Sequence, residues 1–355
     1  MALTQVSPGM LASDSQYTGF KNRIINGAMT INQRGSSITS NGYSLDRYLI
    51  TAVSGSKMTV QQSSDAPTGF SNSLLITSSA ATTIGSTDYY DIGQRIEGFN
   101  TYDLMFGTAN AKTITISFWV KSSLTGTFGA SLQNSAQNRS YPFTFTISTA
   151  STWTQISTTI AGDTSGTWVG ATAGIGMQLL FNLGTGSSTL GTAGAWTAGY
   201  IFPTGEVNIL ATNGATLQIT GVQLEKGSTA TSFDYRPYGT ELQLCQRYFI
   251  SYGGDTVYNK GGFGGSAASG TGATNFVCFP VQMRATPSFS YTGSWAVSDG
   301  VAGTAVTSLA TLSNQSSSLI GLLQITVASG LTTYRPYWLE SNNSTASKLL
   351  WSAEL

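Results

Sequence analysis

The chain has 355 residues, of which only 9% are charged, and its 16 Lys and Arg residues balance 16 Asp and Glu residues. This composition excludes the basic footprint of a nucleic-acid-binding protein. Histidine is absent from the sequence, which excludes Ser-His-Asp and Cys-His catalysis and histidine-ligated zinc. A hydrogen-bond-rich, weakly charged surface is suited to neutral polymers such as glycans, to burial in an oligomer, or to a structural β protein that binds no polar ligand.

We expect no membrane insertion, because no window approaches the about 20 consecutive apolar residues of a membrane span. We also expect no secretory signal, because the first residues lack a charged region followed by an apolar one. The two cysteines, Cys245 and Cys278, do not indicate a disulfide framework. We expect free thiols made in a reducing cytoplasm, with a single bridge as the less favoured alternative.

Residues 1–40 are polar and turn-rich, and we predict that they form an N-terminal attachment arm. A turn is expected at Asn26-Gly27. From there to residue 238, apolar residues recur at every second position. In one such run, Ile114, Ile116, Phe118 and Val120 share one face, while Trp119 lies on the other. About eight such runs, each bounded by turn residues, predict an antiparallel jelly-roll β-sandwich over residues 41–238.

The β region ends in an irregular stretch. A break in alternation at Gly221 predicts a β-bulge. The sequence Thr240-Glu241-Leu242-Gln243 predicts a capping box that starts a short helix. We therefore predict that residues 239–252 form a connecting helix and the seam, that is, the junction between two β domains. Just before it, we expect Asp234 and Arg236 to form a structural ion pair. Residues 253–355 predict a smaller distal β domain, so the fold class is all-β.

Two motifs at the ends of the first domain carry a family resemblance. Asn22–Tyr48 resembles the opening of many phage and prophage tail-fibre proteins, and Leu217–Phe249 resembles the end of the same domain. Between them, Thr113–Phe128 and Ser151–Asp163 look like strands of a family 4/9-type carbohydrate-binding module. Phe276–Tyr291 resembles the variable C-terminal parts of such fibres.

The resemblance implies a virion tail protein assembled in the host cytoplasm. It implies a homotrimer that is attached to a tail or baseplate protein through residues 1–35 and is not an enzyme. The distal domain would be the receptor-binding tip and would bind a host surface polysaccharide. Two alternatives stay open: a tailspike-like glycan depolymerase that uses carboxylates, and a purely structural virion protein.

Aromatic side chains are the candidate carbohydrate-binding residues. Trp119 points away from its core face and could stack on a sugar ring; the alternative is that an arm or a neighbouring subunit buries it. Other aromatic residues lie on loops, where they could bind a sugar or pin the loop to the core. These are Tyr89, Tyr90, Trp168, Trp196 and Tyr200 in the first domain, and Tyr252, Tyr258 and Trp295 in the second.

Four carboxylates lie close together in sequence: Asp88, Asp91, Glu97 and Asp103. Two such acids could cleave a glycosidic bond, or Asp88 and Asp91 could help to bind Ca²⁺. The simpler interpretation is a salt bridge with Arg95. We expect no cofactor other than this candidate Ca²⁺. The glycine-rich run Gly261–Gly265 lacks the context of a phosphate-binding loop.

Overall fold

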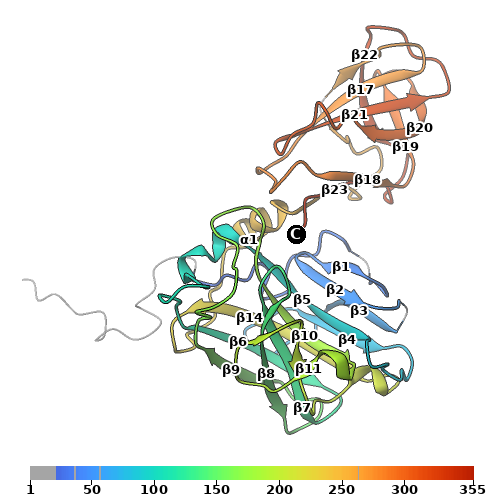
Figure 1. The fold of residues 1–355 in the computed structure, drawn as a ribbon. Helices are drawn as coiled ribbons and strands as arrows, with labels where there is room; N and C mark the ends of the chain where they lie inside the picture. Colours follow the sequence, from blue (N-terminus) through green and yellow to red (C-terminus); the bar gives the residue numbers. More distant parts are fainter. Residues whose placement is uncertain (1–20, 36, 56, 263) are drawn as a thin grey trace, which may run out of the picture. The chain divides into compact units, whose positions relative to one another are not determined.

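The computed structural model describes residues 21–355 apart from Ser36, Ser56 and Phe263. The described chain is built mostly from antiparallel strands (Figure 1), which confirms the predicted all-β class. It divides into two compact units. The first runs to Glu241 and includes Leu355, and the second is Leu242–Glu354. The division falls inside the predicted connecting segment.

Two sheets form the first unit. The larger has seven strands, in the spatial order β1 (Gly42–Leu45), β2 (Tyr48–Ala52), β5 (Tyr89–Glu97), β10 (Ile175–Thr185), β7 (Gly126–Gln133), β8 (Arg139–Ile147) and β12 (Thr197–Ala198). The smaller has five, in the order β3 (Met58–Ser63), β4 (Ser73–Ser78), β14 (Thr216–Lys226), β6 (Ile114–Ser122) and β9 (Thr154–Ile160). Strands that are neighbours in space but distant in sequence are typical of a jelly-roll sandwich.

Short elements complete the first unit. β11 (Leu190–Gly191) and β13 (Phe202–Pro203) pair in parallel. The 3₁₀ turns are η2 (Gly98–Asn100), η3 (Tyr102–Leu104), η4 (Ser187–Thr189) and η5 (Ile209–Ala211). One hydrophobic core lies between the two sheets and takes residues from both.

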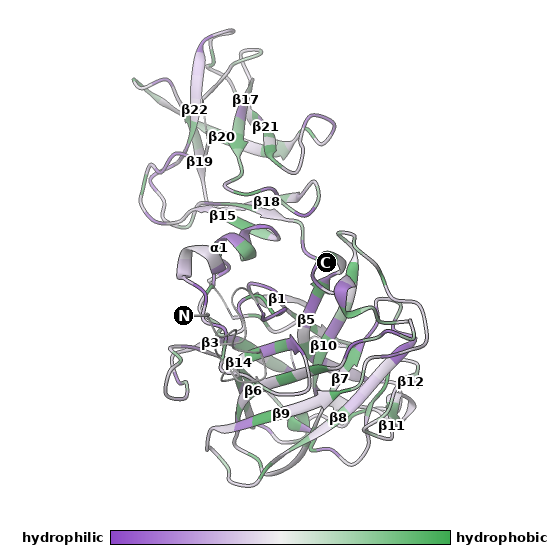
Figure 2. Cartoon of the chain, turned by 90° about the vertical axis from the view of Figure 1, so that its left-hand side faces the viewer, coloured by the Kyte–Doolittle hydropathy of each residue, from purple (hydrophilic) through white to green (hydrophobic). Residues whose placement is uncertain are grey.

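Alternation along β6 positions this core as predicted. Ile114, Ile116, Phe118 and Val120 are at most 1% exposed, while Trp119 on the opposite face is only partly buried. Figure 2 shows the same alternation as bands of contrasting hydropathy along β6. A period of two in sequence gives two faces of a strand, so this part of the fold follows directly from the residues.

The predicted β-bulge is present in β14. Its register against β6 shifts between Thr220 and Gln223, and Gly221 has a φ of +61°. A Cβ atom at Gly221 would lie 2.7 Å from Cζ of Phe70 and 3.1 Å from Cδ1 of Trp119. Both the left-handed backbone and the lack of space therefore require glycine here.

Part of the predicted arm belongs to the first unit. Ile24 and Met29 are fully buried in its core, and the backbone of this segment pairs with the bulged part of β14 through Arg23 N to Leu224 O (2.9 Å) and Val222 N to Gly27 O (2.9 Å). The Asn26-Gly27 turn forms as predicted, closed by Met29 N to Asn26 O at 3.0 Å. Residues 1–20, which carry the rest of the arm prediction, lie outside the described residues.

The helix α1 (Tyr238–Gln246) begins earlier than the sequence predicted. Thr240 is its third residue and is not a cap, so the capping-box prediction is wrong. The amide of Glu241 donates to the carbonyl of Pro237 at 3.0 Å, which starts the helical hydrogen bonds directly after a proline. Proline fits a helix start because its fixed φ matches the helix and its missing N–H is not needed there.

The second unit contains two sheets. Three strands form one, in the order β15 (Phe249–Gly253), β23 (Lys348–Ser352) and β18 (Ser288–Thr292). Six form the other, in the order β16 (Gly265–Ser266), β22 (Pro336–Ser341), β19 (Trp295–Ser298), β20 (Gly303–Thr311), β21 (Ile320–Val327) and β17 (Gly272–Cys278). A bridge between Ala267 and Ala273 joins the two ends of the six-stranded sheet, so this sheet closes into a barrel.

Two remaining sequence predictions concern cysteines and membranes. Cys245 is buried and Cys278 is exposed, and no disulfide joins them. In the described part of the chain, none of the helices combines the length and apolar character needed to cross a bilayer.

Candidate functional site

A pocket of about 420 Å³ opens on the first unit. Three segments form it: the N-terminal segment 22–30, the turn at Gly69–Ser71, and residues 233–241 after β14. We call it the aromatic pocket, because Phe70, Phe233 and Tyr235 line it. Its volume lies within the about 300–1,000 Å³ of pockets that hold small organic ligands.

The three aromatic rings pack against one another as one wall. The Phe70–Phe233, Phe70–Tyr235 and Phe233–Tyr235 centroids lie 5.1, 5.5 and 4.9 Å apart. A tight turn brings Phe233 and Tyr235 together, since the Tyr235 amide donates to the Phe233 carbonyl at 3.1 Å. The Tyr235 hydroxyl donates to the carbonyl of Gly69 at 2.8 Å, which fixes the ring although Tyr235 is 59% exposed.

The bulge in β14 sets the position of this wall. Gly221 lies directly against Phe70 and Trp119, so the absence of a side chain there lets Phe70 settle on the outer face of the five-stranded sheet. Trp119 therefore lies beside Phe70, behind the aromatic wall, and does not line the pocket.

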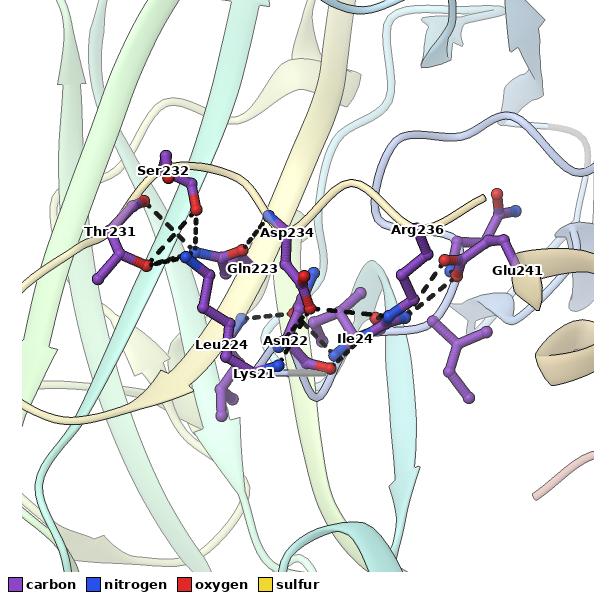
Figure 3. Close-up of polar contacts among 12 residues, drawn as sticks. Lys21, Asn22, Ile24, Gln223, Leu224, Thr231, Ser232, Asp234, Arg236 and Glu241 are labelled. Atoms are coloured by element: carbon purple, nitrogen blue, oxygen red, sulfur yellow. Dashed lines mark hydrogen bonds and ion pairs between the residues drawn. The ribbon is translucent and has the colours of Figure 1, made fainter. Parts of the chain in front are cut away.

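Asp234, Arg236 and Glu241 also line the pocket, and we call them its polar wall. Figure 3 shows their hydrogen bonds and ion pairs. The Arg236 side chain is 3% exposed and pairs with Glu241, Nη1 to Oε2, at 3.3 Å and with Asp234, Nε to Oδ2, at 3.8 Å. The Asp234–Arg236 pair expected from the sequence is therefore present. Arg236 also donates to the carbonyl oxygens of Asn22 and of Ile24, the latter at 3.1 Å.

The N-terminal segment is held in place by the same network. The Asp234 carboxylate accepts from the backbone amides of Lys21 (3.0 Å) and Asn22 (3.2 Å). The Asn22 side chain donates to the carbonyl of Val222 at 3.0 Å and accepts from Leu224 N at 3.0 Å. A Cβ atom on Gly27 would lie only 2.2 Å from the carbonyl oxygen of Val222, so this close approach requires glycine.

These contacts define the chemistry that the pocket can support. Arg236 is balanced by Asp234 and Glu241, so no cation is left over to attract an anion. Hydroxyl groups of Thr30 and Ser71 complete the lining. Burial raises the pKa of Tyr235 above its ordinary value, so its phenol stays neutral. An uncharged ligand with an apolar face for the rings and hydroxyls for the polar wall matches this arrangement.

Two of the predicted tryptophans pin loops to the core of the first unit. Trp168 and Trp196 pack edge-to-face on each other and on Phe106, with centroids 4.9–5.7 Å apart. Their indole N–H groups are also satisfied: Trp196 donates to Ala161 O at 2.7 Å, and Trp168 donates to Ser165 O at 3.2 Å. This arrangement matches the structural alternative considered for the loop aromatics.

The other predicted aromatics divide between the two units. In the first, Tyr90 is 1% exposed, and Tyr89 packs edge-to-face on Tyr200 at 5.6 Å. In the second, Tyr258 is 53% exposed, and Tyr252 lines a smaller pocket. The proposal for Trp295 needs correction. Its side chain is 2% exposed within the core of the second unit, where it presents no face to a ligand.

The predicted carboxylates do not form one site. Asp88 accepts from Gly85 N at 2.8 Å within a local turn. Asp103 pairs with Arg23 at 2.9 Å, and Glu97 is buried. Over residues 21–355, with their three gaps, no group of three or more Asp, Glu, Cys or His residues is placed to hold a metal ion. Nothing in these contacts adds to the candidate Ca²⁺ site.

Asp91 lies in a different environment. It is fully buried on the outer face of the seven-stranded sheet, where Tyr200 donates to its carboxyl group. Its cross-strand neighbour Asn182 donates to Glu206, whose carboxylate covers Gly129. Burial raises the pKa of Asp91 to about 7 and that of Glu206 to about 8.

Sequence reasoning missed the residues that line the aromatic pocket. One signal was available: Phe233 and Tyr235 are two aromatic residues only two positions apart, directly after the predicted bulge and its strand. The third ring, Phe70, comes from the turn before β4, and nothing in the local pattern links it to residue 233.

No protein-family model matches this chain, and no curated protein matches it. Solved structures of low similarity cover somewhat more than half of this chain. They include the enzymatically active domain of tailspike protein 4 of bacteriophage CBA120, with 12% identity, 58% of this chain and 21% of that chain covered, and a TM-score of 0.34. A family 4 carbohydrate-binding module is 15% identical, with 57% of this chain and 98% of that chain covered and a TM-score of 0.30. The family 11 module from Clostridium thermocellum, in complex with a mixed-linked tetrasaccharide, has 12% identity, coverage of 55% and 98%, and a TM-score of 0.30.

Proposed function

We propose that this chain binds an uncharged glycan without cleaving it, and that the aromatic pocket is a binding site. The observation that carries the proposal is a three-ring wall together with a polar wall whose one cation, Arg236, is fully paired, in a pocket of about 420 Å³. The flat face of a sugar ring packs on aromatic rings, while its hydroxyls need hydrogen-bond partners. Phe70, Phe233 and Tyr235 supply the rings of the pocket, and Asp234, Arg236 and Glu241 supply its charged polar groups.

The two Tyr-Arg-Pro-Tyr segments of this chain supply a matched test. Tyr235→Ala removes a pocket ring, whereas Tyr334→Ala removes an 86% exposed ring from the same tetrapeptide in the second unit. We expect Tyr235→Ala to weaken binding to an array of uncharged oligosaccharides by about tenfold, the effect of losing one well-packed aromatic contact. Tyr334→Ala should leave binding unchanged. Equal binding by the wild-type protein and both variants would show that the aromatic pocket is not the glycan-binding site.

The biological setting that we propose is a phage or prophage tail fibre, located in the virion. The end motifs Asn22–Tyr48 and Leu217–Phe249 support it by resemblance. In this setting the chain is a homotrimer attached to a tail or baseplate protein through its N-terminal residues, and it contacts a host surface polysaccharide. Light scattering on the purified protein tests the trimer: a monomer at micromolar concentration would contradict it. Labelled protein that stains no host cell would favour a purely structural virion role.

A carboxylate-dependent depolymerase is the second candidate, because strongly raised carboxyl pKa values are common at catalytic sites. Asp91 and Glu206 are such groups. However, a general acid must reach its substrate, and Asp91 is fully buried. Release of reducing ends from host polysaccharide, lost in Asp91→Asn, would favour the enzyme. Intact polysaccharide recovered after prolonged incubation would favour binding without cleavage.

A further inference from the structure

A second pocket, of about 270 Å³, lies within the second unit. β15 contributes Tyr252, the end of β17 contributes Val277 and Cys278, and the segment Lys260–Gly262 completes it. We call it the glycine pocket. It is separate from the aromatic pocket, since all its lining residues belong to the second unit.

Two glycines form the floor because no side chain fits there. A Cβ atom on Gly261 would lie 2.7 Å from the Trp295 ring. One on Gly262 would lie 2.7 Å from the carbonyl oxygen of Phe276 and 3.1 Å from Cγ2 of Val277. The glycine-rich run noted in the sequence therefore lets the backbone lie directly on β17 and on the core, and it leaves an apolar surface at the base of the pocket.

Tyr252 supplies one wall and one polar atom. Its hydroxyl donates to the carbonyl of Cys278 at 2.8 Å. Burial raises the pKa of Tyr252 to about 12, so the phenol stays protonated. Because the hydroxyl proton is used, the oxygen can act toward a ligand only as an acceptor.

Lys260 brings no unbalanced charge to the pocket. Its ammonium group pairs with Glu340 and lies 4.5 Å from the centre of the Trp338 ring. Glu340 in turn accepts from the Trp338 indole at 2.9 Å. An anionic ligand would have to compete with this carboxylate, so the pocket favours an uncharged group.

A buried amide lies immediately behind the floor. Asn275 is 0% exposed, and neither its Nδ2 nor its Oδ1 atom has a hydrogen-bond partner. Nδ2 lies 2.9 Å from the position that a Cβ on Gly262 would take. Leaving a buried amide without partners is costly, and such groups often mark functional positions. This second, independent observation points to the same place as the pocket.

We propose that the glycine pocket binds the acetamido group of an N-acetylated amino sugar. The methyl group packs on Gly261, Gly262 and Val277, and the amide N–H donates to the oxygen of Tyr252. A volume of about 270 Å³ suits a single sugar ring or its substituent, since it lies just below the about 300 Å³ at which pockets for larger ligands begin. The inference extends the proposed glycan binding to a second site with its own specificity.

Cys278 provides a readout confined to this pocket. It is exposed and lines the pocket, whereas the other thiol of the chain, Cys245, is buried. The rate at which a thiol reagent modifies Cys278 in the native full-length protein therefore reports occupancy of the glycine pocket. N-acetylglucosamine and glucose are the probes, because they differ only in the acetamido group at C2.

We expect N-acetylglucosamine at tens of millimolar to slow modification of Cys278 several-fold, and glucose to have no effect. Tyr252→Phe keeps the ring but removes the accepting oxygen, and it should weaken the protection by up to about tenfold. Its rate without sugar is measured as well, so that any change in the reactivity of Cys278 itself is corrected. Equal protection by both sugars, or protection by neither, would overturn the proposal.

Variants in the aromatic pocket separate this test from that of the proposed function. Tyr235→Ala should leave protection of Cys278 by N-acetylglucosamine unchanged while it weakens binding to the oligosaccharide array. Loss of protection in Tyr235→Ala would mean that Cys278 responds to the first pocket, and the second site would then be rejected. If the wild-type protein did not bind the oligosaccharide array, the proposed site in the aromatic pocket would be rejected. The test of the glycine pocket would be unaffected.

Discussion

The hydroxyl of Tyr200 donates a hydrogen bond to the carboxyl group of Asp91, which is fully buried on β5. The contact links segment 199–203 to the seven-stranded sheet across 109 residues of sequence. Burial outweighs this hydrogen bond and raises the pKa of Asp91 to about 7. The carboxyl group therefore changes its protonation near neutral pH in the folded chain.

The contribution of Asp91 to the stability of the first unit should decrease as the pH rises from about 4 to about 7. An Asp in the unfolded chain titrates near about pH 4, so between that pH and about 7 the folded state holds a proton that the unfolded state has lost. This contribution is fully present below about pH 4 and is lost as the pH rises through the folded pKa, at up to about 1.4 kcal/mol per pH unit. Thermal unfolding at pH 5 and pH 8.5 measures it together with the contribution of Glu206, whose pKa burial raises to about 8.

Asp91→Asn should reduce that difference between the two pH values, because its amide cannot titrate. Asp88→Asn, a substitution in the turn before β5, is the matched control and should keep the wild-type difference. If Asp91→Asn kept the full pH dependence, the buried carboxyl group could not be its source.

Gly221→Ala should destabilise the first unit and weaken glycan binding together. The new methyl would meet Phe70 at 2.7 Å in a backbone with a φ of +61°, so the aromatic wall must move. Gly214→Ala is the control for backbone strain alone, because Gly214 has a φ of +75° and no atom within 4 Å of its Cβ position. We expect Gly214→Ala to lower the free energy of unfolding by about 1–2 kcal/mol and Gly221→Ala to lower it further. Chemical denaturation measures the free energy of unfolding. A similar loss of stability in both variants would show that Phe70 can move aside at little energetic cost.

Arg236→Ala should cost about 3–5 kcal/mol in the free energy of unfolding of the first unit, because it leaves Glu241 buried without its cation. Arg335 occupies the same position in the second Tyr-Arg-Pro-Tyr segment and pairs with Asp299 at 2.7 Å, but its side chain is 47% exposed. Arg335→Ala should therefore change stability little. Equal effects of the two substitutions would contradict a special role for the buried network.

Trp196→Ala should lower stability by about 1–3 kcal/mol and leave glycan affinity unchanged. The ring packs on Phe106, Tyr141 and Trp168, and its N–H is bonded to Ala161. Affinity for the oligosaccharide array, measured at a temperature where the variant stays folded, is the decisive quantity. A loss of affinity would restore Trp196 as a binding residue.

Local patterns predicted the local parts of this structure. Alternation placed Ile114 to Val120 in the core, and a break in alternation located the bulge at Gly221. The helix start was misjudged because Thr240 and Gln243 match a capping box, while Pro237, three residues before Thr240, already supplies a start. Exposure was also not predictable: Trp295 and Tyr258 both follow turn residues, yet one is buried and the other is exposed.

The aromatic pocket depends on contacts between distant segments. Phe70 and Phe233 are far apart in sequence, and they meet only because β14 crosses the sheet between β4 and β6. Such pairing is set by the packing of whole strands, so the residues around position 70 contain no signal of it. The polar wall was partly foreseen through Asp234 and Arg236, but its connection to Asn22 and Ile24 was not.

The mutually paired charges around the aromatic pocket have a consequence for the salt dependence of ligand binding. Dissolved ions weaken attractions between exposed charges that are more than about 10 Å apart at 0.1 M salt, but they act far less on buried pairs. Arg236, Asp234 and Glu241 are bonded to one another and largely shielded from solvent. The affinity of the aromatic pocket for an uncharged glycan should therefore be the same at low and at high salt concentration.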